Sequence, residues 1–167
     1  MNIPAVSFIA RSGTGKTTLV TGVIAALKQR GYRVGALKHD AYRFEIDHPG
    51  KDSHRFTAAG ADTMLITSSA KLALVRQHAV SPPVEELLES YFGDVDIVLT
   101  EGFKQSGLPK IEVHRAACGH DLLSRGETSD PTLLAVATDT DLALDVPVLD
   151  LNDPGSVADF VEGHFLA

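Results

Sequence analysis

The sequence predicts an α/β fold in which a mostly parallel central sheet is flanked by helices. A short apolar run, a glycine-rich loop and a helical pattern follow one another at the start of the chain. Two further apolar segments of strand length occur later, and each ends in polar residues. Buried strands that alternate with amphipathic helices are typical of parallel sheets with right-handed crossovers. Because the chain has 167 residues and no repeat or linker, we expect one domain over residues 1–167.

The opening of the chain predicts a strand–loop–helix–strand unit. Residues 3–9 form an apolar run rich in Val, Ile and Phe, which indicates a buried strand. After the loop, apolar residues recur at helical spacing between Leu19 and Leu27, and this helix should end near Gly31. Residues 32–37 predict a second strand.

The rest of the chain predicts a hairpin and a further set of strands and helices. A short helix is expected over residues 52–59, and residues 62–66 and 71–75 predict the two strands of a β-hairpin. Ser81 and Pro82 predict the N-cap and the first position of a helix, and Asp153 and Pro154 predict the same for the final helix. Residues 97–100 and 133–137 predict two central strands.

Residues 10–17, Ala-Arg-Ser-Gly-Thr-Gly-Lys-Thr, predict the phosphate loop of a P-loop NTPase. Glycines let the backbone N–H groups approach phosphate oxygens, Lys16 can reach the β and γ phosphates, and the Thr17 hydroxyl can bind Mg²⁺. Ala10 replaces the usual first glycine, which is tolerated where φ is negative. We expect the phosphates to be bound by Ser12, Gly13, Thr14, Gly15, Lys16, Thr17 and Thr18.

Polar residues at the ends of two later strands extend this predicted site. Glu101, at the tip of the first, can hold the Mg²⁺ hydration shell or orient the attacking water, although an exposed loop carboxylate is the alternative. Thr138 and Asp139, at the tip of the second, are candidates for binding the base. A carboxylate can accept two hydrogen bonds from guanine N1 and N2, which adenine does not supply, so GTP is favoured even though an Asn-Lys-x-Asp signature is absent. Asp96, at the opposite strand end, is expected to be a solvated carboxylate.

Arg11 is the third candidate for catalysis, beside Lys16 and Glu101. An arginine in the phosphate loop can stabilise the charge that develops during phosphoryl transfer, including on the nucleotide of a dimer partner. A solvated loop side chain is the alternative. Since no residue clearly fills the roles of both a supplied arginine and a positioned glutamine, hydrolysis should be slow, on the order of 10⁻⁴ to 10⁻² s⁻¹.

Composition excludes several classes of function. The net charge of −7 argues against general nucleic-acid binding, which needs a basic face. No apolar stretch reaches the roughly 18 residues that cross a bilayer, and the first residues lack the pattern of a signal peptide. The single cysteine, Cys118, excludes an internal disulfide and fits a reducing compartment. We therefore expect a cytoplasmic protein without a nucleic-acid or membrane partner.

Several motifs together resemble the molybdopterin-guanine dinucleotide biosynthesis protein B (MobB) family. They are residues 12–19 of the phosphate loop, Leu37-Lys38-His39, Asp47-His48-Pro49-Gly50-Lys51-Asp52-Ser53, Glu101-Gly102-Phe103-Lys104, Pro109-Lys110-Ile111-Glu112 and Ala137-Thr138-Asp139. The resemblance implies a GTP- and Mg²⁺-binding, slowly hydrolysing P-loop protein. Such proteins assist molybdopterin guanylyltransferase, the enzyme that joins GMP to molybdopterin in molybdenum cofactor biosynthesis.

The resemblance has two further implications. It implies a homodimer with a sheet extended across the interface, and the β-hairpin is the extension that we expect to be used for dimerisation. It also makes Asp52 a candidate Mg²⁺ ligand beside Thr17 and Glu101, although an acid at a helix N-terminus is an equal alternative.

Four cationic residues follow the Glu101 strand: Lys104, Lys110, His114 and Arg115. We hypothesise that this loop contacts the phosphate of molybdopterin or the partner enzyme, with a solvated basic loop as the alternative. Three other functions stay open. They are a small-molecule kinase, although no arginine-rich lid is evident; a nickel-insertion GTPase, whose Cys-x-His pair Cys118-Gly119-His120 would match; and an interaction module with a structural nucleotide.

Overall fold

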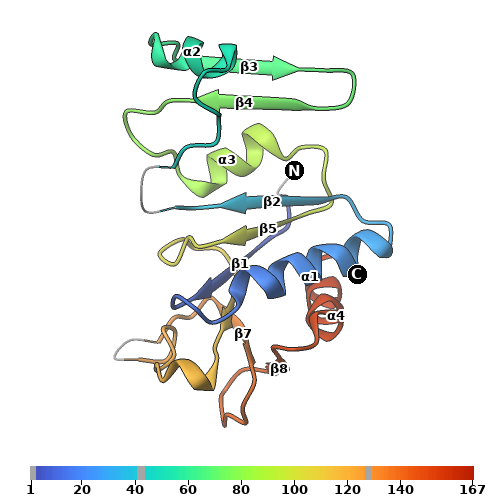
Figure 1. Ribbon diagram of the computed structural model, residues 1–167. Coiled ribbons are helices and arrows are strands. Elements are labelled where there is room, and N and C mark those ends of the chain that lie inside the picture. The colour runs from blue at the N-terminus through green and yellow to red at the C-terminus, as the bar shows by residue number, and fades with distance from the viewer. Residues whose placement is uncertain (1–2, 41–43, 127–128) are drawn as a thin grey trace. The chain divides into compact units, whose positions relative to one another are not determined.

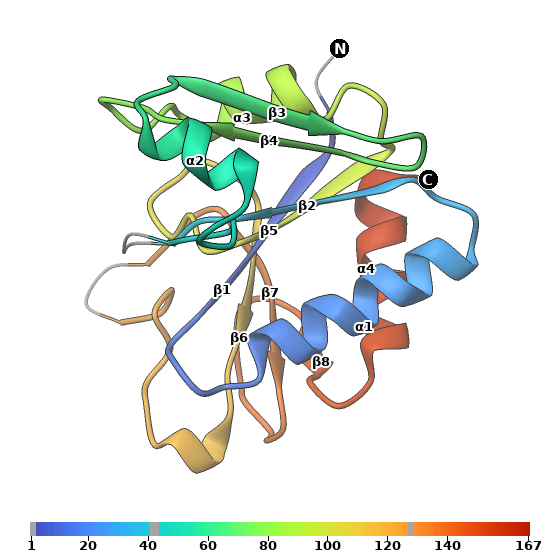
Figure 2. The same cartoon turned by 45° about the horizontal axis from the view of Figure 1, so that its top comes forward.

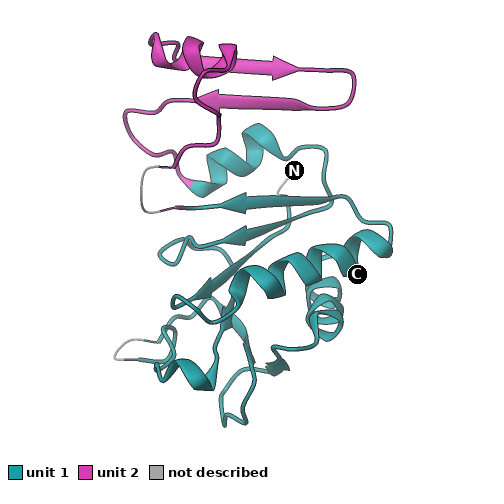
Figure 3. Cartoon of the chain, viewed as in Figure 1, with its two compact units in different colours: residues 1–39, 84–167 teal, residues 40–83 magenta. Residues whose placement is uncertain are grey.

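The computed structural model describes residues 3–40, 44–126 and 129–167 (Figure 1). The chain forms two compact units (Figure 3). Residues 1–39 together with 84–167 form the first, which we call the sheet unit, and residues 40–83 form the second, the hairpin unit. The phosphate loop and the strands that end at Glu101 and Thr138 all belong to the sheet unit.

Six parallel strands make up the sheet of the sheet unit. Their order is β2 (Val34–Lys38), β5 (Ile97–Glu101), β1 (Ala5–Ala10), β6 (Lys110–Val113), β7 (Leu133–Thr138) and β8 (Val148–Asp150). Every neighbouring pair is parallel, so the predicted α/β fold with a mostly parallel sheet is confirmed. The carboxyl ends of these strands meet at one edge of the sheet, where ligands bind in folds of this kind.

Helices cover both faces of this sheet (Figure 2). They are α1 (Lys16–Gln29), α3 (Val84–Tyr91) and α4 (Pro154–Phe165). Alternate strand residues point to opposite faces. Phe8 and Leu99 share one core with α1 and α4, whereas Val98 packs with Leu88 of α3 in a second core. The two cores hold the central strands rigidly between the helix layers, and the loops at the strand ends are positioned by them.

Two helix starts test the predicted caps. Asp153 caps α4 as predicted, since its side chain accepts a hydrogen bond from the Ser156 N–H at 3.1 Å and Pro154 is the first helical residue. The helix predicted to begin at Pro82 begins instead at Val84. The residue before a proline is driven away from the α region, so Pro83 keeps Pro82 out of the helix.

Strands β6 and β8 were not predicted. In β6, Lys110 and Glu112 alternate with Ile111 and Val113, which is typical of a half-exposed strand, yet all four residues are buried. Burial of the two charged residues is possible because each has specific partners, described below. β8 has only three residues, too few for a periodic pattern to stand out.

The hairpin unit contains α2 (Asp52–Ala58) and an antiparallel pair of strands, β3 (Thr63–Thr67) and β4 (Leu72–Arg76). The predicted hairpin is therefore confirmed, one residue later in the chain than expected. Ser68 closes the turn, because its hydroxyl accepts hydrogen bonds from the Ala70 and Lys71 N–H groups. Leu65 and Leu72 are more than half exposed on this pair of strands.

Candidate nucleotide-binding site

The loop between β1 and α1 has the backbone of a phosphate-binding site. Gly13 and Gly15 have φ angles of 83° and 87°, which L side chains rarely adopt. Gly15 is the N-cap of α1, where no side chain caps the helix and no acidic residue lies in the first turn. The first N–H groups of a helix and its dipole attract anions, so this donor set fits a phosphate. Ala10 ends a buried strand with an ordinary φ, and its methyl group is therefore accommodated.

Glu101 joins the start of α1 to the end of β5. Its Oε1 lies 2.6 Å from Lys16 Nζ, and its Oε2 accepts a hydrogen bond from the Thr17 hydroxyl at 3.0 Å. Lys38, at the end of β2, places its Nζ 3.9 Å from the same carboxylate. The neighbouring positions of β2, β5 and β1 in the sheet bring these residues together. A hydroxyl and a carboxylate side by side are oxygen ligands of the kind that Mg²⁺ prefers, so the residues present fit that ion.

The ionisation of Glu101 follows from this arrangement. Burial alone would raise the pKa of Glu101, but hydrogen bonds from Lys16 and Thr17 and the charge of Lys38 outweigh it, and the pKa lies below its usual value. The side chains of Glu101 and Lys16 are only 15% and 18% exposed. Charges in such a setting interact more strongly than on an open surface.

A strained turn fixes the position of Glu101. Gly102 has a φ of 101°, and a Cβ there would lie 3.1 Å from the His39 carbonyl oxygen. Phe103 has a positive φ of 53°, unlike any other non-glycine residue that the structure describes, and its ring lies 4.9 Å from that of His39. The Gly102 carbonyl accepts a hydrogen bond from the Ser7 hydroxyl at 2.6 Å. The Glu-Gly-Phe segment is therefore packed tightly against the middle of β1 and the residue that follows β2. Strain of this kind is common at functional sites.

Asp139 lies on the other side of the phosphate loop, at the end of β7. Its Oδ1 accepts a hydrogen bond from the Ala116 N–H at 2.8 Å, and its Oδ2 lies 3.2 Å from Arg115 Nη1. The hydrogen bond from Ala116, with the nearby charge of Arg115, lowers the pKa of Asp139. Thr138 is buried, and its hydroxyl lies 2.9 Å from His114 Nδ1. Its side chain thus contacts the protein interior beneath Asp139.

A polar pocket of about 610 Å³ opens beside Asp139. Its walls come from the ends of β7 and β8 and include Asp139, Asp141, Asp150 and Asn152. Asp141, Asp150 and Asn152 were not predicted from the sequence. The pocket is rich in hydrogen-bond acceptors, which suits a ligand edge that carries donors.

Three side-chain contacts hold the segment after β6, residues 114–126, against the phosphate loop. Arg115 Nε donates to the Thr14 carbonyl at 3.0 Å, and Cys118 Sγ lies 3.6 Å from the Gly13 carbonyl. In the opposite direction, Arg11 Nε donates to the Asp121 carbonyl at 3.2 Å. We call residues 114–126 the clasp. The clasp packs on the phosphate loop because β6 is paired directly with β1.

Glu112 anchors the clasp from below. Its side chain is 2% exposed, and its two carboxylate oxygens accept hydrogen bonds from the Leu123 and Ser124 N–H groups at 2.6 and 2.9 Å. From the sequence, Arg115 was expected in a basic cluster, and its contact with the phosphate loop was not predicted. Prediction of β6 as a neighbour of β1 could have revealed this contact, because the residues that follow such a strand lie beside the phosphate loop.

The hypothesis that Lys110 belongs to a ligand-binding basic loop is wrong. Lys110 lies inside β6 with 2% exposure. Its Nζ donates to the Ser106 carbonyl at 2.7 Å and the Thr132 hydroxyl at 2.6 Å and pairs with Asp130 at 3.0 Å. These contacts leave it no surface for a ligand. Lys104, in contrast, is exposed.

The two remaining carboxylates considered in the sequence, Asp52 and Asp96, each pair with an arginine. Asp52 belongs to the hairpin unit, where it is 83% exposed and pairs with Arg55 at 3.5 Å, so its role as a Mg²⁺ ligand stays a prediction. Asp96, expected to be merely solvated, accepts hydrogen bonds from the Arg33 backbone N–H at 2.7 Å and from the Arg33 guanidinium. It therefore joins β5 to the start of β2.

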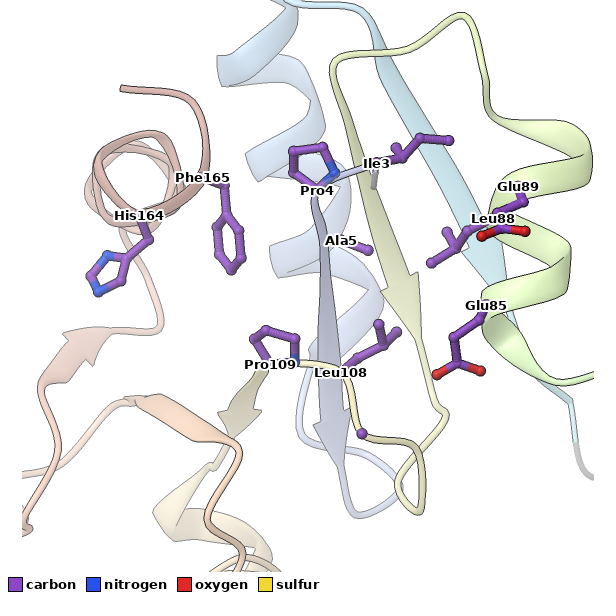
Figure 4. Close-up of a pocket in the computed structure, with 11 residues that line it drawn as sticks. Ile3, Pro4, Ala5, Glu85, Leu88, Glu89, Leu108, Pro109, His164 and Phe165 are labelled. Carbon is purple, nitrogen blue, oxygen red and sulfur yellow. The ribbon is translucent and has the colours of Figure 1, made fainter. Parts of the chain in front are cut away.

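A second pocket, of about 500 Å³, opens at the opposite end of the sheet (Figure 4). It lies where β1 and β6 begin, with Leu108 and Phe165 among its apolar residues and Glu85, Glu89 and His164 among its polar ones. Ligands of parallel α/β sheets bind at the carboxyl ends of the strands, and the candidate site therefore remains at the phosphate loop.

Comparison with known proteins identifies the family. The family model described as "Molybdopterin guanine dinucleotide synthesis protein B" (MobB) matches residues 5–139. The chain belongs to the MobB family. It is 40% identical to the molybdopterin-guanine dinucleotide biosynthesis adapter protein of Escherichia coli (strain K12), over 95% of this chain and 91% of that protein. It is 34% identical to the adapter protein of the same description from Haemophilus influenzae, over 98% and 92%.

Solved MobB structures share the fold. A crystal structure of Bacillus subtilis MobB aligns with a TM-score of 0.77 and 24% identity, over 98% of both chains. A crystal structure of molybdopterin-guanine biosynthesis protein B aligns with a TM-score of 0.73 and 26% identity, over 96% of this chain and 99% of that one. In the parts of the chain that the structure describes, no helix is long and apolar enough to span a bilayer.

Proposed function

We propose that this chain binds Mg²⁺ and GTP at the phosphate loop, hydrolyses GTP slowly, and acts as an adapter in molybdopterin guanine dinucleotide biosynthesis. The observation that carries the proposal is the convergence of Lys16 and Thr17 on Glu101 beside an uncapped helix start. Membership of the MobB family, with two relatives described as adapter proteins, supports the biosynthetic role.

Each part of the site has a proposed task. Backbone N–H groups of residues 12–18 and the Lys16 ammonium would bind the phosphates, and Thr17 and Glu101 would hold Mg²⁺ directly or through its water ligands. Bound Mg²⁺ would supply positive charge for the phosphate oxygens. Asp139, beside the acceptor-rich pocket at the ends of β7 and β8, would accept the guanine N1 and N2 hydrogens.

Slow turnover follows from what surrounds the terminal phosphate position. Lys16 and Lys38 provide cations there, whereas the Arg11 guanidinium is directed to the Asp121 carbonyl of its own chain. A rate on the order of 10⁻⁴ to 10⁻² s⁻¹ is typical when an arginine and a positioned glutamine are not supplied. We propose that Arg11 acts, if released from Asp121, on the nucleotide of a dimer partner. Unchanged hydrolysis in Arg11→Ala, in a preparation that is demonstrably dimeric, would remove this role.

The hairpin unit is the proposed dimer contact. Leu65 and Leu72 are 51% and 60% exposed, and the strand register places both on the same face of the hairpin as Leu74. Exposed apolar residues on a two-stranded sheet favour pairing with another chain. Sedimentation of the wild type should give a dimer, and Leu72→Asp should shift it toward monomer; an unchanged sedimentation coefficient would reject this surface.

The adapter role is tested by partner capture. Immobilised wild-type chain should retain purified molybdopterin guanylyltransferase, and retention should differ between GTP-loaded and nucleotide-free samples. Lys16→Ala, in which the phosphate site is damaged, should lose the nucleotide dependence. Equal capture in every condition would indicate a binding module without nucleotide control, and no capture at all would reject the adapter role.

A further inference from the structure

Arg115 connects the phosphate loop to Asp139. Its Nε donates to the Thr14 carbonyl at 3.0 Å and its Nη1 lies 3.2 Å from Asp139 Oδ2. Its Nη2 lies 3.2 Å from the position that a Cβ on Gly15 would take. Among the residues that the structure describes, no protein atom accepts a hydrogen bond from Nη2. One guanidinium therefore bridges the gap between the loop and the end of β7, with a donor left for another molecule.

Sheet order places Arg115 and Glu101 on opposite sides of β1. Glu101 ends β5 on one side, whereas Arg115 follows β6 and Asp139 follows β7 on the other. If Mg²⁺ and the terminal phosphate lie at Glu101, the ribose and base extend toward β6 and β7. Arg115 is thus on the base side of the loop, away from the phosphoryl group that would be transferred.

The contact between Arg115 and Asp139 is fixed in position and partly exposed to solvent. The side chains of Arg115 and Asp139 are 33% and 21% exposed. The backbone next to Arg115 is fixed by the Ala116 N–H bond to Asp139, and the clasp is anchored by buried Glu112. A side chain with this combination of fixed position and partial exposure is preorganised for a ligand.

We propose that Arg115 is a base-binding residue, whose guanidinium stacks on the purine and orients the Asp139 carboxylate toward the guanine edge. The proposal rests on the proposed function. An arginine can stack on an aromatic face while its edge makes hydrogen bonds, because the guanidinium is planar. A carboxylate offers about four acceptor positions, so those of Asp139 that the Ala116 and Arg115 donors leave unused remain for guanine. In an Asn-Lys-x-Asp signature the lysine stands two residues before the aspartate. Here that position, 137, is alanine, and the cation beside Asp139 is Arg115, which follows β6.

Titration with a series of truncated ligands tests this inference. Calorimetry would compare Mg·GTP, Mg·ribose 5′-triphosphate and Mg·tripolyphosphate on the wild type, Arg115→Gln and Arg115→Ala. The glutamine variant keeps a donor for the Thr14 carbonyl, in case the alanine variant folds poorly. Lys28→Ala, which removes an exposed cation at the far end of α1, is the matched control.

Loss of the stacked cation should weaken GTP binding about 5- to 30-fold, while both ligands without a base should bind within about 2-fold of the wild type. Arg115→Gln should also lower the preference for GTP over ATP, because Asp139 loses its orienting partner. Equal losses for GTP and tripolyphosphate would overturn the base-side assignment, and so would unchanged GTP binding. A wild type that binds no GTP would instead defeat the proposed function, which separates the two failures.

Discussion

Lys16 Nζ lies 2.6 Å from Glu101 Oε1, and this ion pair joins the first residue of α1 to the last residue of β5. The same carboxylate accepts the Thr17 hydroxyl. Lys16 and Thr17, which would bind phosphate and Mg²⁺, therefore both contact the Glu101 carboxylate. Binding of Mg²⁺ and a nucleotide would replace these contacts with contacts to the ligand, so we expect the positions of Lys16, Thr17 and Glu101 to depend on one another.

Acid stability should report the Glu101 contacts. The pKa of Glu101 in the folded chain lies below the ordinary value of 4.5, so its contribution to stability is complete above that pH and is lost as the pH falls through the lower folded value. Glu101→Gln removes this contribution. Urea unfolding between pH 3 and pH 7 should therefore show a shallower fall of the unfolding free energy on the acid side than in the wild type.

Glu89→Gln is the control for that measurement, because Glu89 is an exposed acid of α3 at the other end of the sheet. Between pH 3 and pH 7, the unfolding free energy of Glu89→Gln should fall as steeply as that of the wild type. If the unfolding free energy of Glu101→Gln fell with pH as steeply as that of the wild type, the contacts of Glu101 with Lys16 and Thr17 would not persist in solution.

Lys110→Met should destabilise the fold rather than alter ligand binding. The substitution leaves Asp130 without its cation, although Asp130 is 24% exposed and keeps the Thr132 N–H and hydroxyl as donors. Breaking a buried ion pair costs about 3–5 kcal/mol, and the partial exposure of Asp130 should reduce this to about 2–3 kcal/mol in urea unfolding. Lys104→Met, an exposed site, should stay within about 0.5 kcal/mol of the wild type. A similar small change for both variants would show that Lys110 is not a structural residue.

Gly102→Ala should be costly for two separate reasons. The φ of 101° disfavours an L side chain, and the added Cβ would lie 3.1 Å from the His39 carbonyl. Together these should lower the unfolding free energy by about 1–3 kcal/mol and displace Glu101. Gly163→Ala, in α4 with open space around it, should instead leave stability unchanged or raise it by up to about 1 kcal/mol. Thermal melts of the two variants compare them directly, and equal melting temperatures would argue against strain at Gly102.

The sequence was sufficient for the parts of the fold that have regular local signals. The apolar run of β1, the glycines of the phosphate loop and the Asp153-Pro154 cap each depend on neighbouring residues, so their patterns predicted the structure. Glu101 could be placed beside the phosphate loop because it ends a strand that begins with three apolar residues. These signals are local. Combined with the rule that such strand–helix–strand units form parallel sheets, they predicted the fold class.

Other features depend on contacts between distant segments, which a single sequence does not reveal. β6 was missed because buried Lys110 and Glu112 look like surface residues until their partners, Asp130 and the Leu123–Ser124 backbone, are known. The clasp was missed for the same reason, since its place beside the phosphate loop follows from the pairing of β6 with β1. The pairing of Asp139 with Arg115 could not be predicted without that placement.

The most direct measurement is a calorimetric titration of Mg·GTP into the wild type and into Lys16→Ala. We expect one saturable site per chain in the wild type. Lys16→Ala should bind about 10- to 100-fold more weakly, because a charge-assisted hydrogen bond to phosphate contributes about 1.5–3 kcal/mol. Absence of saturable binding in the wild type, or equal affinity in the two proteins, would contradict the proposed GTP site.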